Sequence, residues 1–325
     1  MKPAVKRSPT VLCVALNPAI DQTIEVAGLR IGEVNRAQRA QQDAGGKGVN
    51  VASCLADHGT AVAVAGLLGR ANAGLFEALF NAKRIANECV YLDGLTRINT
   101  KLVDPQRGET TDINLPGPQL APAQVAARLR EVLAVVEHEP GLSWLVLSGS
   151  LPPGWPADTY ATLIQQAHAR RIRVMLDTSG PALGAALLAG PDIIKPNRDE
   201  LGAHLGRRLV TQEETVTAAR ELLDAQPMLS LIAVSMGHEG ALFITRSEVV
   251  FARPLPVKPL SSVGAGDAMV AGVVAAQLEG FGLAETARLA TAFAAGKLER
   301  LGAHLPSPQR VRELAMQVQL GNTQQ

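Results

Sequence analysis

Short apolar runs alternate along the chain with longer amphipathic segments. Runs of about five apolar residues bounded by turn residues are typical of strands buried on both faces, and apolar positions three or four apart predict helices. The predicted strands are 11–16, 61–66, 144–147, 173–177, 193–195 and 231–235. The predicted helices are 46–58, 73–85, 121–137, 156–170, 211–225, 267–278, 283–300 and 308–317. This alternation predicts an α/β fold with a doubly wound, mostly parallel sheet.

Two segments depart from this pattern. Residues 21–42 and 97–115 alternate polar with apolar positions and are interrupted by Gly and Pro. A period of two predicts half-exposed strands, which we expect to be antiparallel and to lie outside the main sheet. Each segment leaves the α/β pattern and rejoins it. We therefore expect one domain over 1–325, with a small β lid built from about 20–43 and 95–116.

Composition narrows the class of protein. Hydrophobic residues make up 47% of the 325 residues and aromatic residues only 3%, so the core must be aliphatic, as in helices packed on a parallel sheet. With 31 basic and 30 acidic residues, the chain lacks the basic footprint of a nucleic-acid or membrane-surface binder.

The apolar run 11–16 is too short for a signal peptide or a membrane span. Three cysteines without zinc spacing are typical of reduced thiols, so we expect a cytoplasmic protein.

The strongest candidate for chemistry is Gly264-Ala265-Gly266-Asp267, which opens a predicted helix. Two glycines let the backbone approach a ligand, and a helix N-terminus attracts anions. The motif therefore predicts an anion site for a phosphoryl group, with the Asp267 carboxylate within reach of a hydroxyl. Taken alone, it is equally well explained as a turn followed by an N-capping Asp.

A second glycine-rich helix start is Gly45-Gly46-Lys47-Gly48-Val49-Asn50. It is not a Walker A loop, because no Ser or Thr follows the Lys. Its backbone could meet sugar hydroxyls, with Asn50 one turn into the helix. Asp21 follows the first predicted strand, at the sheet edge where doubly wound folds bind ligands. A flexible turn and a solvated Asp explain these two features as well.

Two further turns follow predicted strands. Asn197 and Glu200 lie three apart after Lys195, which suits a magnesium–phosphate unit reached through water, but also suits a helix cap. The turn from Ser235 to Gly240 could lie along a nucleotide or could be an ordinary hairpin turn.

Cations are present in the lid segments. Arg36, Arg97 and Lys101 lie in or beside them, and Arg97, Asn99 and Lys101 share one face if 97–101 is a strand. Such a row could hold a phosphorylated substrate, although each cation alone could be a solvated surface charge.

The order and spacing of these motifs resemble the ribokinase-like (PfkB) carbohydrate kinases. The resemblance runs from about Val11 to about Pro306. It rests on Leu16-Asn17-Pro18-Ala19-Ile20-Asp21, Gly45-Gly46-Lys47-Gly48-Val49-Asn50-Val51-Ala52, Ser148-Gly149-Ser150-Leu151-Pro152-Pro153-Gly154, Lys195-Pro196-Asn197 and Val263-Gly264-Ala265-Gly266-Asp267. It implies a three-layer α/β domain with a β lid, ATP as co-substrate, Mg²⁺, and a homodimer formed through the lid.

The resemblance also implies a role for each matched residue. Asp267 would be the catalytic base, and Gly264, Ala265 and Gly266 would form the anion hole. The sugar would be held by Asp21, Gly45, Gly46, Lys47 and Asn50, and its phosphate by Arg97 with Arg36 and Lys101. ATP would contact Lys195, Asn197, Ser235, Gly237, Gly240 and Gly266. Glu200 and Asn197 would act on Mg²⁺, Glu200 through water.

Within the family, the resemblance is to the phosphosugar branch. Thr96-Arg97-Ile98-Asn99-Thr100-Lys101 and Thr111-Asp112-Ile113-Asn114-Leu115-Pro116-Gly117 resemble segments of 1-phosphofructokinases, which implies phosphorylation of fructose 1-phosphate to fructose 1,6-bisphosphate. Tagatose-6-phosphate kinase and 6-phosphofructokinase stay open as alternatives, and a non-catalytic sugar-phosphate sensor is a more remote one. Residues 82–90 lack the family's usual Gly-Val or Gly-Ile step, so we expect a local loop change there.

Overall fold

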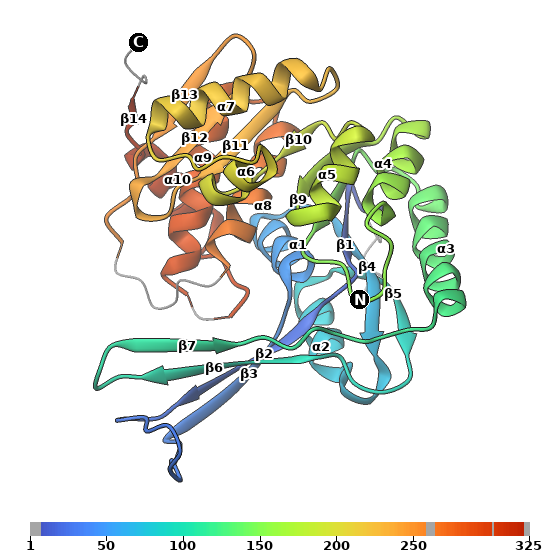
Figure 1. The fold of residues 1–325 in the computed structure, drawn as a ribbon, viewed down its shortest axis with the longest axis vertical. Helices are drawn as coiled ribbons and strands as arrows, with labels where there is room; N and C mark the ends of the chain where they lie inside the picture. Colours follow the sequence, from blue (N-terminus) through green and yellow to red (C-terminus); the bar gives the residue numbers. More distant parts are fainter. Residues whose placement is uncertain (1–7, 258–263, 301, 322–325) are drawn as a thin grey trace, which may run out of the picture.

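The computed structural model describes residues 8–257, 264–300 and 302–321. In this part of the chain the large sheet comprises β1 (Val11–Ala15), β4 (Val62–Gly69), β5 (Ala86–Leu92), β8 (Trp144–Ser148), β9 (Arg173–Asp177), β10 (Ile193–Ile194), β11 (Leu231–Ser235), β12 (Ala241–Ile244), β13 (Val249–Ala252) and β14 (Leu320–Gly321). Their order is β14-β13-β12-β11-β10-β9-β8-β1-β4-β5 (Figure 1). The strands from β5 to β11 are parallel, and β12, β13 and β14 complete one end in antiparallel fashion.

Helices cover both faces of this sheet. One face packs against α1 (Lys47–His58), α2 (Gly74–Lys83), α8 (Ala265–Leu278), α9 (Leu283–Leu298) and α10 (Pro308–Gln317). The other packs against α3 (Pro122–His138), α4 (Thr159–Ala169), α5 (Gly180–Leu188), α6 (Arg198–His204) and α7 (Gln212–Ala225). The predicted three-layer, mostly parallel α/β fold is confirmed. In the described part of the chain, no helix has the length and hydrophobicity that a membrane span requires.

A close contact places the start of α1 over the end of β1. A Cβ at Gly48 would lie 2.6 Å from the backbone oxygen of Val14, so only glycine lets the helix approach the strand this closely. At Gly46, which precedes α1 with a φ of 92°, a Cβ would lie 2.8 Å from Cα of Pro18. The first turn of α1 is therefore held at the carboxyl edge of the sheet.

The second sheet projects from that edge as a lid (Figure 1). It contains β2 (Ala19–Glu25), β3 (Arg39–Gly45), β6 (Ile98–Asp104) and β7 (Glu109–Ile113) in the order β3-β2-β6-β7. The expectation of antiparallel strands needs one correction, because β2 and β6 are parallel. The reason is the connectivity: β2 follows β1 and β6 follows β5, and both leave the same edge of a parallel sheet in the same direction.

The predicted strands and helices omit six strands and α-helices of the structure, namely β5, α5, α6, β12, β13 and β14. For two of them the reason is plain in the sequence. The edge strand β5 carries exposed Asn87 and Glu88, which hide its strand character, and α5 is so uniformly apolar that no helical period stands out. The segment 82–90, where we expected a loop change, is a direct connection. Helix α2 ends at Lys83, and Arg84 takes the left-handed conformation, with φ 58° and ψ 35°, that glycine usually supplies at a helix end.

Candidate active site

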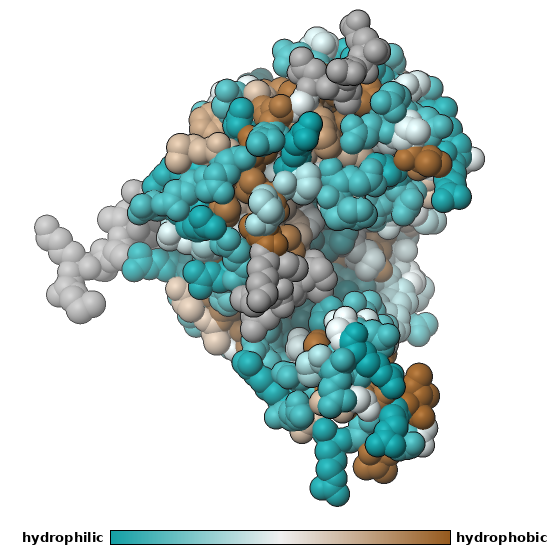
Figure 2. All heavy atoms as spheres, turned by 90° about the vertical axis from the view of Figure 1, so that its left-hand side faces the viewer, coloured by the Kyte–Doolittle hydropathy of each residue, from teal (hydrophilic) through white to brown (hydrophobic). Residues whose placement is uncertain are grey.

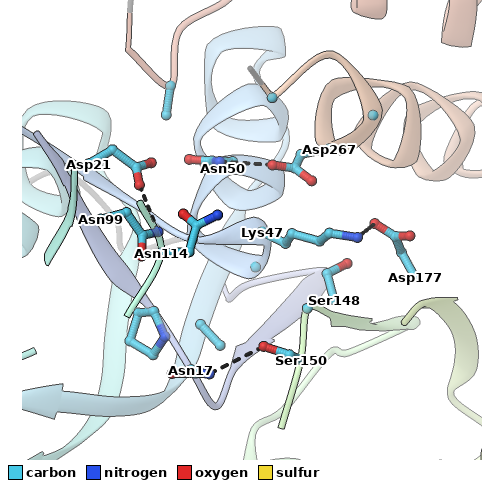
Figure 3. A pocket seen from close by; sticks show the side chains of 18 of the residues that line it. Asn17, Asp21, Lys47, Asn50, Asn99, Asn114, Ser148, Ser150, Asp177 and Asp267 are labelled. Carbon is cyan, nitrogen blue, oxygen red and sulfur yellow. Dashed lines mark hydrogen bonds and ion pairs between the residues drawn. The ribbon is translucent and has the colours of Figure 1, made fainter. Parts of the chain in front are cut away.

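A cleft of about 720 Å³ lies between the carboxyl edge of the large sheet and the lid. Its walls include the ends of β1, β8 and β9, the first turns of α1 and α8, and the inner face of β2 and β6. Figure 3 shows that side chains from these strands and helices point into one shared space. Open α/β sheets bind ligands at this edge, where the strand ends leave a crevice.

Asp267 and Asn50 bring the two glycine-rich helix starts together. Asp267 lies in the first turn of α8, is 7% exposed, and accepts a hydrogen bond of 2.8 Å from Nδ2 of Asn50 in α1 (Figure 3). Burial, helped by the Asp177 charge and opposed by Lys47, raises the pKa of Asp267 to about 6. A carboxylate with this pKa accepts a proton near neutral pH more readily than an ordinary Asp.

The N-terminus of α8 has the geometry expected of an anion site. Gly264 precedes the helix with a φ of 82°, a conformation that side chains rarely adopt. Gly264 and Gly266 line the cleft, whereas Ala265 does not. The first N–H groups of a helix have no partner within it and carry partial positive charge. Ser262 and Val263, which precede this motif, lie outside the described residues.

A buried carboxylate that sequence reasoning missed joins two predicted lysines. Asp177 is 1% exposed at the end of β9, and its two oxygens lie 3.2 Å from Nζ of Lys47 and 3.3 Å from Nζ of Lys195. Burial lowers the pKa of Lys47 and the Asp177 charge raises it, with a net rise. The signal was available, because Asp177 ends a predicted strand at the carboxyl edge.

On the lid side, Asp21 of β2 accepts a hydrogen bond of 3.2 Å from Nδ2 of Asn99 in β6 (Figure 3). Burial is the main reason that the pKa of Asp21 is raised. Gly45 does not line the cleft, but a Cβ there would collide with the Asp21 carboxylate. Gly45 therefore makes room for a neighbour, while Gly46 and Lys47 line the cleft.

The three predicted lid cations differ in their surroundings. The half-buried Arg97 lines the cleft and donates hydrogen bonds to the backbone oxygens of Asn17, Pro18 and Leu115, at 2.8, 3.2 and 2.6 Å. Its other two N–H groups have no partner in the described part of the chain. Lys101 also lines the cleft and pairs with Asp112 at 2.6 Å. Arg36 is exposed in the loop between β2 and β3 and does not line the cleft.

At the opposite end of the cleft, Asn197 caps α6. Its side chain accepts from the Glu200 backbone at 2.7 Å, and Glu200 accepts from the Asn197 backbone at 2.9 Å. Both side chains line the cleft while forming this capping box. Ser235, at the end of β11, also lines the cleft. Gly237 and Gly240 do not line it; they shape the turn after β11, both with positive φ.

Lys297 was also missed, and no sequence signal marks it. It lies in α9, is 3% exposed, and lines the cleft beside Gly264.

Known proteins are similar to this chain in both sequence and fold. A model of the pfkB family of carbohydrate kinases matches residues 13–310. The chain is 52% identical to a 1-phosphofructokinase of Rhodobacter capsulatus, covering 94% of this chain and 95% of that protein. It is 49% identical to a 1-phosphofructokinase of Xanthomonas campestris, covering 95% and 98%. The Escherichia coli phosphofructokinase-2 in complex with fructose-6-phosphate superposes with a TM-score of 0.85 and 28% identity, over 96% of this chain and 99% of that one.

Proposed function

Because the chain belongs to the pfkB family of carbohydrate kinases, we propose that it transfers the γ-phosphoryl group of ATP to fructose 1-phosphate, giving ADP and fructose 1,6-bisphosphate. Relatives that share about half of its residues are 1-phosphofructokinases, which supports this substrate. The observation that carries the proposal is the buried Asp267 carboxylate at the N-terminus of α8, inside a cleft whose lid presents Arg97 and Lys101.

Asp267 is the base of the proposed reaction. It accepts the proton of the C6 hydroxyl, and that oxygen forms a bond to the γ-phosphorus. The bond from the γ-phosphorus to the β,γ-bridging oxygen breaks, and ADP leaves with the electron pair. The hydrogen bond from Asn50 holds the Asp267 carboxylate in place while the proton is transferred. Phosphoryl transfer depends on this alignment and on charge neutralisation more than on covalent chemistry.

The helix N-terminus and Lys195 provide charge neutralisation. The amides at Gly264 and Gly266 stabilise the negative charge of the group in transfer. A Cβ at Gly266 would lie 3.6 Å from Nζ of Lys195, so Lys195 reaches the same space. Ser235 and Asn197 lie farther along the cleft, where the nucleotide extends.

Magnesium fits this site as a companion of ATP. In the described part of the chain no group of three or more His, Cys, Asp or Glu side chains could hold a metal ion by itself. Mg²⁺ commonly keeps its waters and binds through one or two carboxylates together with phosphates. Glu200, with Asn197 beside it, would hold such an ion through water. When bound, Mg²⁺ neutralises the charge of the β- and γ-phosphates.

The existing phosphate of the substrate is assigned to the lid. Arg97 and Lys101 face the cleft, and the free N–H groups of Arg97 and the Lys101 ammonium are donors for a phosphate. Arg36 does not reach the cleft of its own chain in this arrangement. A non-catalytic sensor would need no buried base, so the position of Asp267 favours an enzyme.

The substrate is tested by comparing kcat/KM for fructose 1-phosphate, fructose 6-phosphate and tagatose 6-phosphate with Mg·ATP. Fructose 6-phosphate is the main alternative substrate, because the structurally similar Escherichia coli phosphofructokinase-2 was solved in complex with fructose-6-phosphate. We expect fructose 1-phosphate to be preferred by at least tenfold. A preference for either other sugar would overturn the substrate and keep the kinase, while inactivity on all three would overturn the proposed function.

The lid is the proposed contact of a homodimer. It exposes large hydrophobic side chains, namely Ile31, Val34, Leu95, Ile113 and Leu115. The lower part of Figure 2, where the lid projects, shows hydrophobic side chains among hydrophilic ones. Light scattering of the purified protein would give the mass of a dimer, and a monomer would refute this assignment. A cytoplasmic location stays a prediction.

A further inference from the structure

Lys297 lies in α9 with its charged side chain buried, and α9 provides little compensation for that burial. The residue is 3% exposed, and removing an ammonium from water is costly unless it is paired. Among the described residues, its Nζ has one hydrogen bond, of 3.3 Å, to the backbone oxygen of Arg300. No carboxylate of the described chain forms an ion pair with it, whereas Lys83 pairs with Asp57 and Lys195 with Asp177. Within residues 8–257, 264–300 and 302–321, the other two donors of Lys297 have no partner.

The position of this ammonium points to a ligand. A Cβ built on Gly264 would lie 3.1 Å from Cε and 3.9 Å from Nζ of Lys297, and 3.9 Å from Nδ2 of Asn50. The ammonium therefore lies beside the N-terminus of α8, on the side where Asn50 reaches Asp267. Burial lowers the pKa of Lys297, and nearby Asp267 and Asp43 offset this only in part, so the net direction is downward. Lys297 also lines the cleft.

We propose that Lys297 is a further catalytic residue, whose ammonium donates a hydrogen bond to the phosphoryl group during its transfer. This inference rests on the proposed kinase function. A phosphoryl group at the start of α8 would give the free donors of Lys297 an anionic partner, and the ammonium would add a full charge to the partial charges of the helix amides. No bond to Lys297 forms or breaks. A buried ammonium without an ion-pair partner among the described residues weakens the fold, and its role in the reaction explains why it is kept.

Replacing Lys297 by Met tests this role, because Met fills similar space without charge. We expect kcat to fall by about 10²–10³-fold, as when one oxyanion-stabilising donor is removed. The KM for the sugar phosphate should stay within threefold. Tm should rise, because the variant no longer buries an unpaired ammonium. Lys297→Gln, which keeps a donor without the charge, should lose less activity than Lys297→Met.

Lys83→Met is the matched control. The Lys83 side chain is 9% exposed, and it also bonds a backbone oxygen of the same C-terminal segment, that of Ala303, at 3.0 Å. Its ammonium pairs with Asp57 at 2.6 Å, so its removal leaves a carboxylate unpaired. We expect the opposite result, with a lower Tm and an unchanged kcat. A purely structural Lys297 would behave like Lys83, with lower Tm and kcat within threefold of wild type, and that result would overturn the proposal.

A binding measurement separates this inference from the choice of sugar. Calorimetry with Mg²⁺ compares ADP with an ATP analogue that has an imido group between the β- and γ-phosphates. Lys297→Met should weaken the analogue by about tenfold, as expected for one lost charge-assisted hydrogen bond, and leave ADP unchanged. Equal weakening of both ligands would overturn the role of Lys297. A selective loss in a protein that is inactive on every sugar phosphate would overturn the proposed kinase function and keep Lys297 as a contact of the γ-phosphate.

Discussion

The floor of the cleft and the lid above it hold their polar side chains in different ways. The floor, formed by Lys47, Asn50, Asp177, Lys195 and Asp267, is mostly buried, and its partners come from distant parts of the chain. On the lid, Lys101 pairs with Asp112 of the neighbouring strand, and the Asp112 side chain is 53% exposed. Buried charges act strongly and depend on each other, whereas exposed pairs are screened by water. We therefore expect changes in the floor to alter kcat and changes in the lid to alter KM.

The largest effect is expected from Asp267→Asn in the floor. The substitution keeps the shape and removes the base, and a positioned base contributes about 10²–10⁴-fold. Steady-state kinetics should show a loss of that order in kcat, with the KM values for ATP and the sugar phosphate little changed. Asp112→Asn on the lid is the control and should keep kcat. An Asp267→Asn enzyme with more than a tenth of wild-type kcat would contradict the assignment of the base.

The pH dependence sharpens the same point. Burial raises the pKa of Asp267 to about 6, and only the ionised carboxylate accepts a proton. We expect kcat/KM to fall by about tenfold for each pH unit below this value. Because the folded pKa of Asp267 lies above the unfolded one, stability falls as the pH rises from about 4 to about 6 and stays at the lower level above that. Asp267→Asn should therefore raise Tm more at pH 8 than at pH 4. An acid limb centred near pH 4 would argue for another group.

Lys101→Met tests the lid side of the comparison. The loss of one charge-assisted hydrogen bond, at least about 1.5 kcal/mol, should raise the KM for fructose 1-phosphate by about tenfold and leave kcat nearly unchanged. Free fructose lacks the phosphate and should be a poor substrate for both enzymes. Its kcat/KM should change little between wild type and Lys101→Met. If both sugars lost the same activity, Lys101 would not hold the phosphate.

Glu200→Gln should have a smaller effect at the nucleotide end. Glutamine can form the same capping box with Asn197, so α6 keeps its start while the carboxylate charge is removed. We expect a several-fold higher Mg²⁺ concentration for half-maximal activity and an unchanged KM for the sugar phosphate. An unaltered magnesium dependence would leave Glu200 with the capping role alone.

The smallest effect is expected outside both regions, at Arg84. Its left-handed conformation costs a side chain about 1 kcal/mol, which glycine avoids at some cost in chain entropy. Arg84→Gly should therefore raise Tm by about 1–2 °C without a change in kinetics. Gly59, which ends α1 with a φ of 99° and has open space around a Cβ, is the reciprocal control, and Gly59→Ala should lower Tm. A lower Tm for Arg84→Gly would refute the strain.

The sequence alone determined the layers of the fold and the two helix starts that line the floor. Apolar runs and helical periods are local properties, and so is the preference of Gly264 and Gly266 for the start of a helix. For the same reason the hydrophobic pattern located the strand ends within a few residues. It could not reveal that β2 and β6 run parallel, since that depends on which edge of the sheet each strand leaves.

Only the tertiary structure decided which side chains act together. Asn50 and Asp267 are 217 residues apart, Lys47 and Asp177 are 130 apart, and the lid position of Arg97 is tied to backbone oxygens of Asn17 and Pro18. In the sequence, nothing distinguishes Lys297 from other lysines in helices. Its burial beside Gly264 arises only from the packing of α9. Desolvation and ion pairing arise from such packing, and they set the pKa of a buried group and the free donors of a buried cation. The sequence therefore indicated which residue types could act, while their pKa values and hydrogen-bond partners depended on the folded chain.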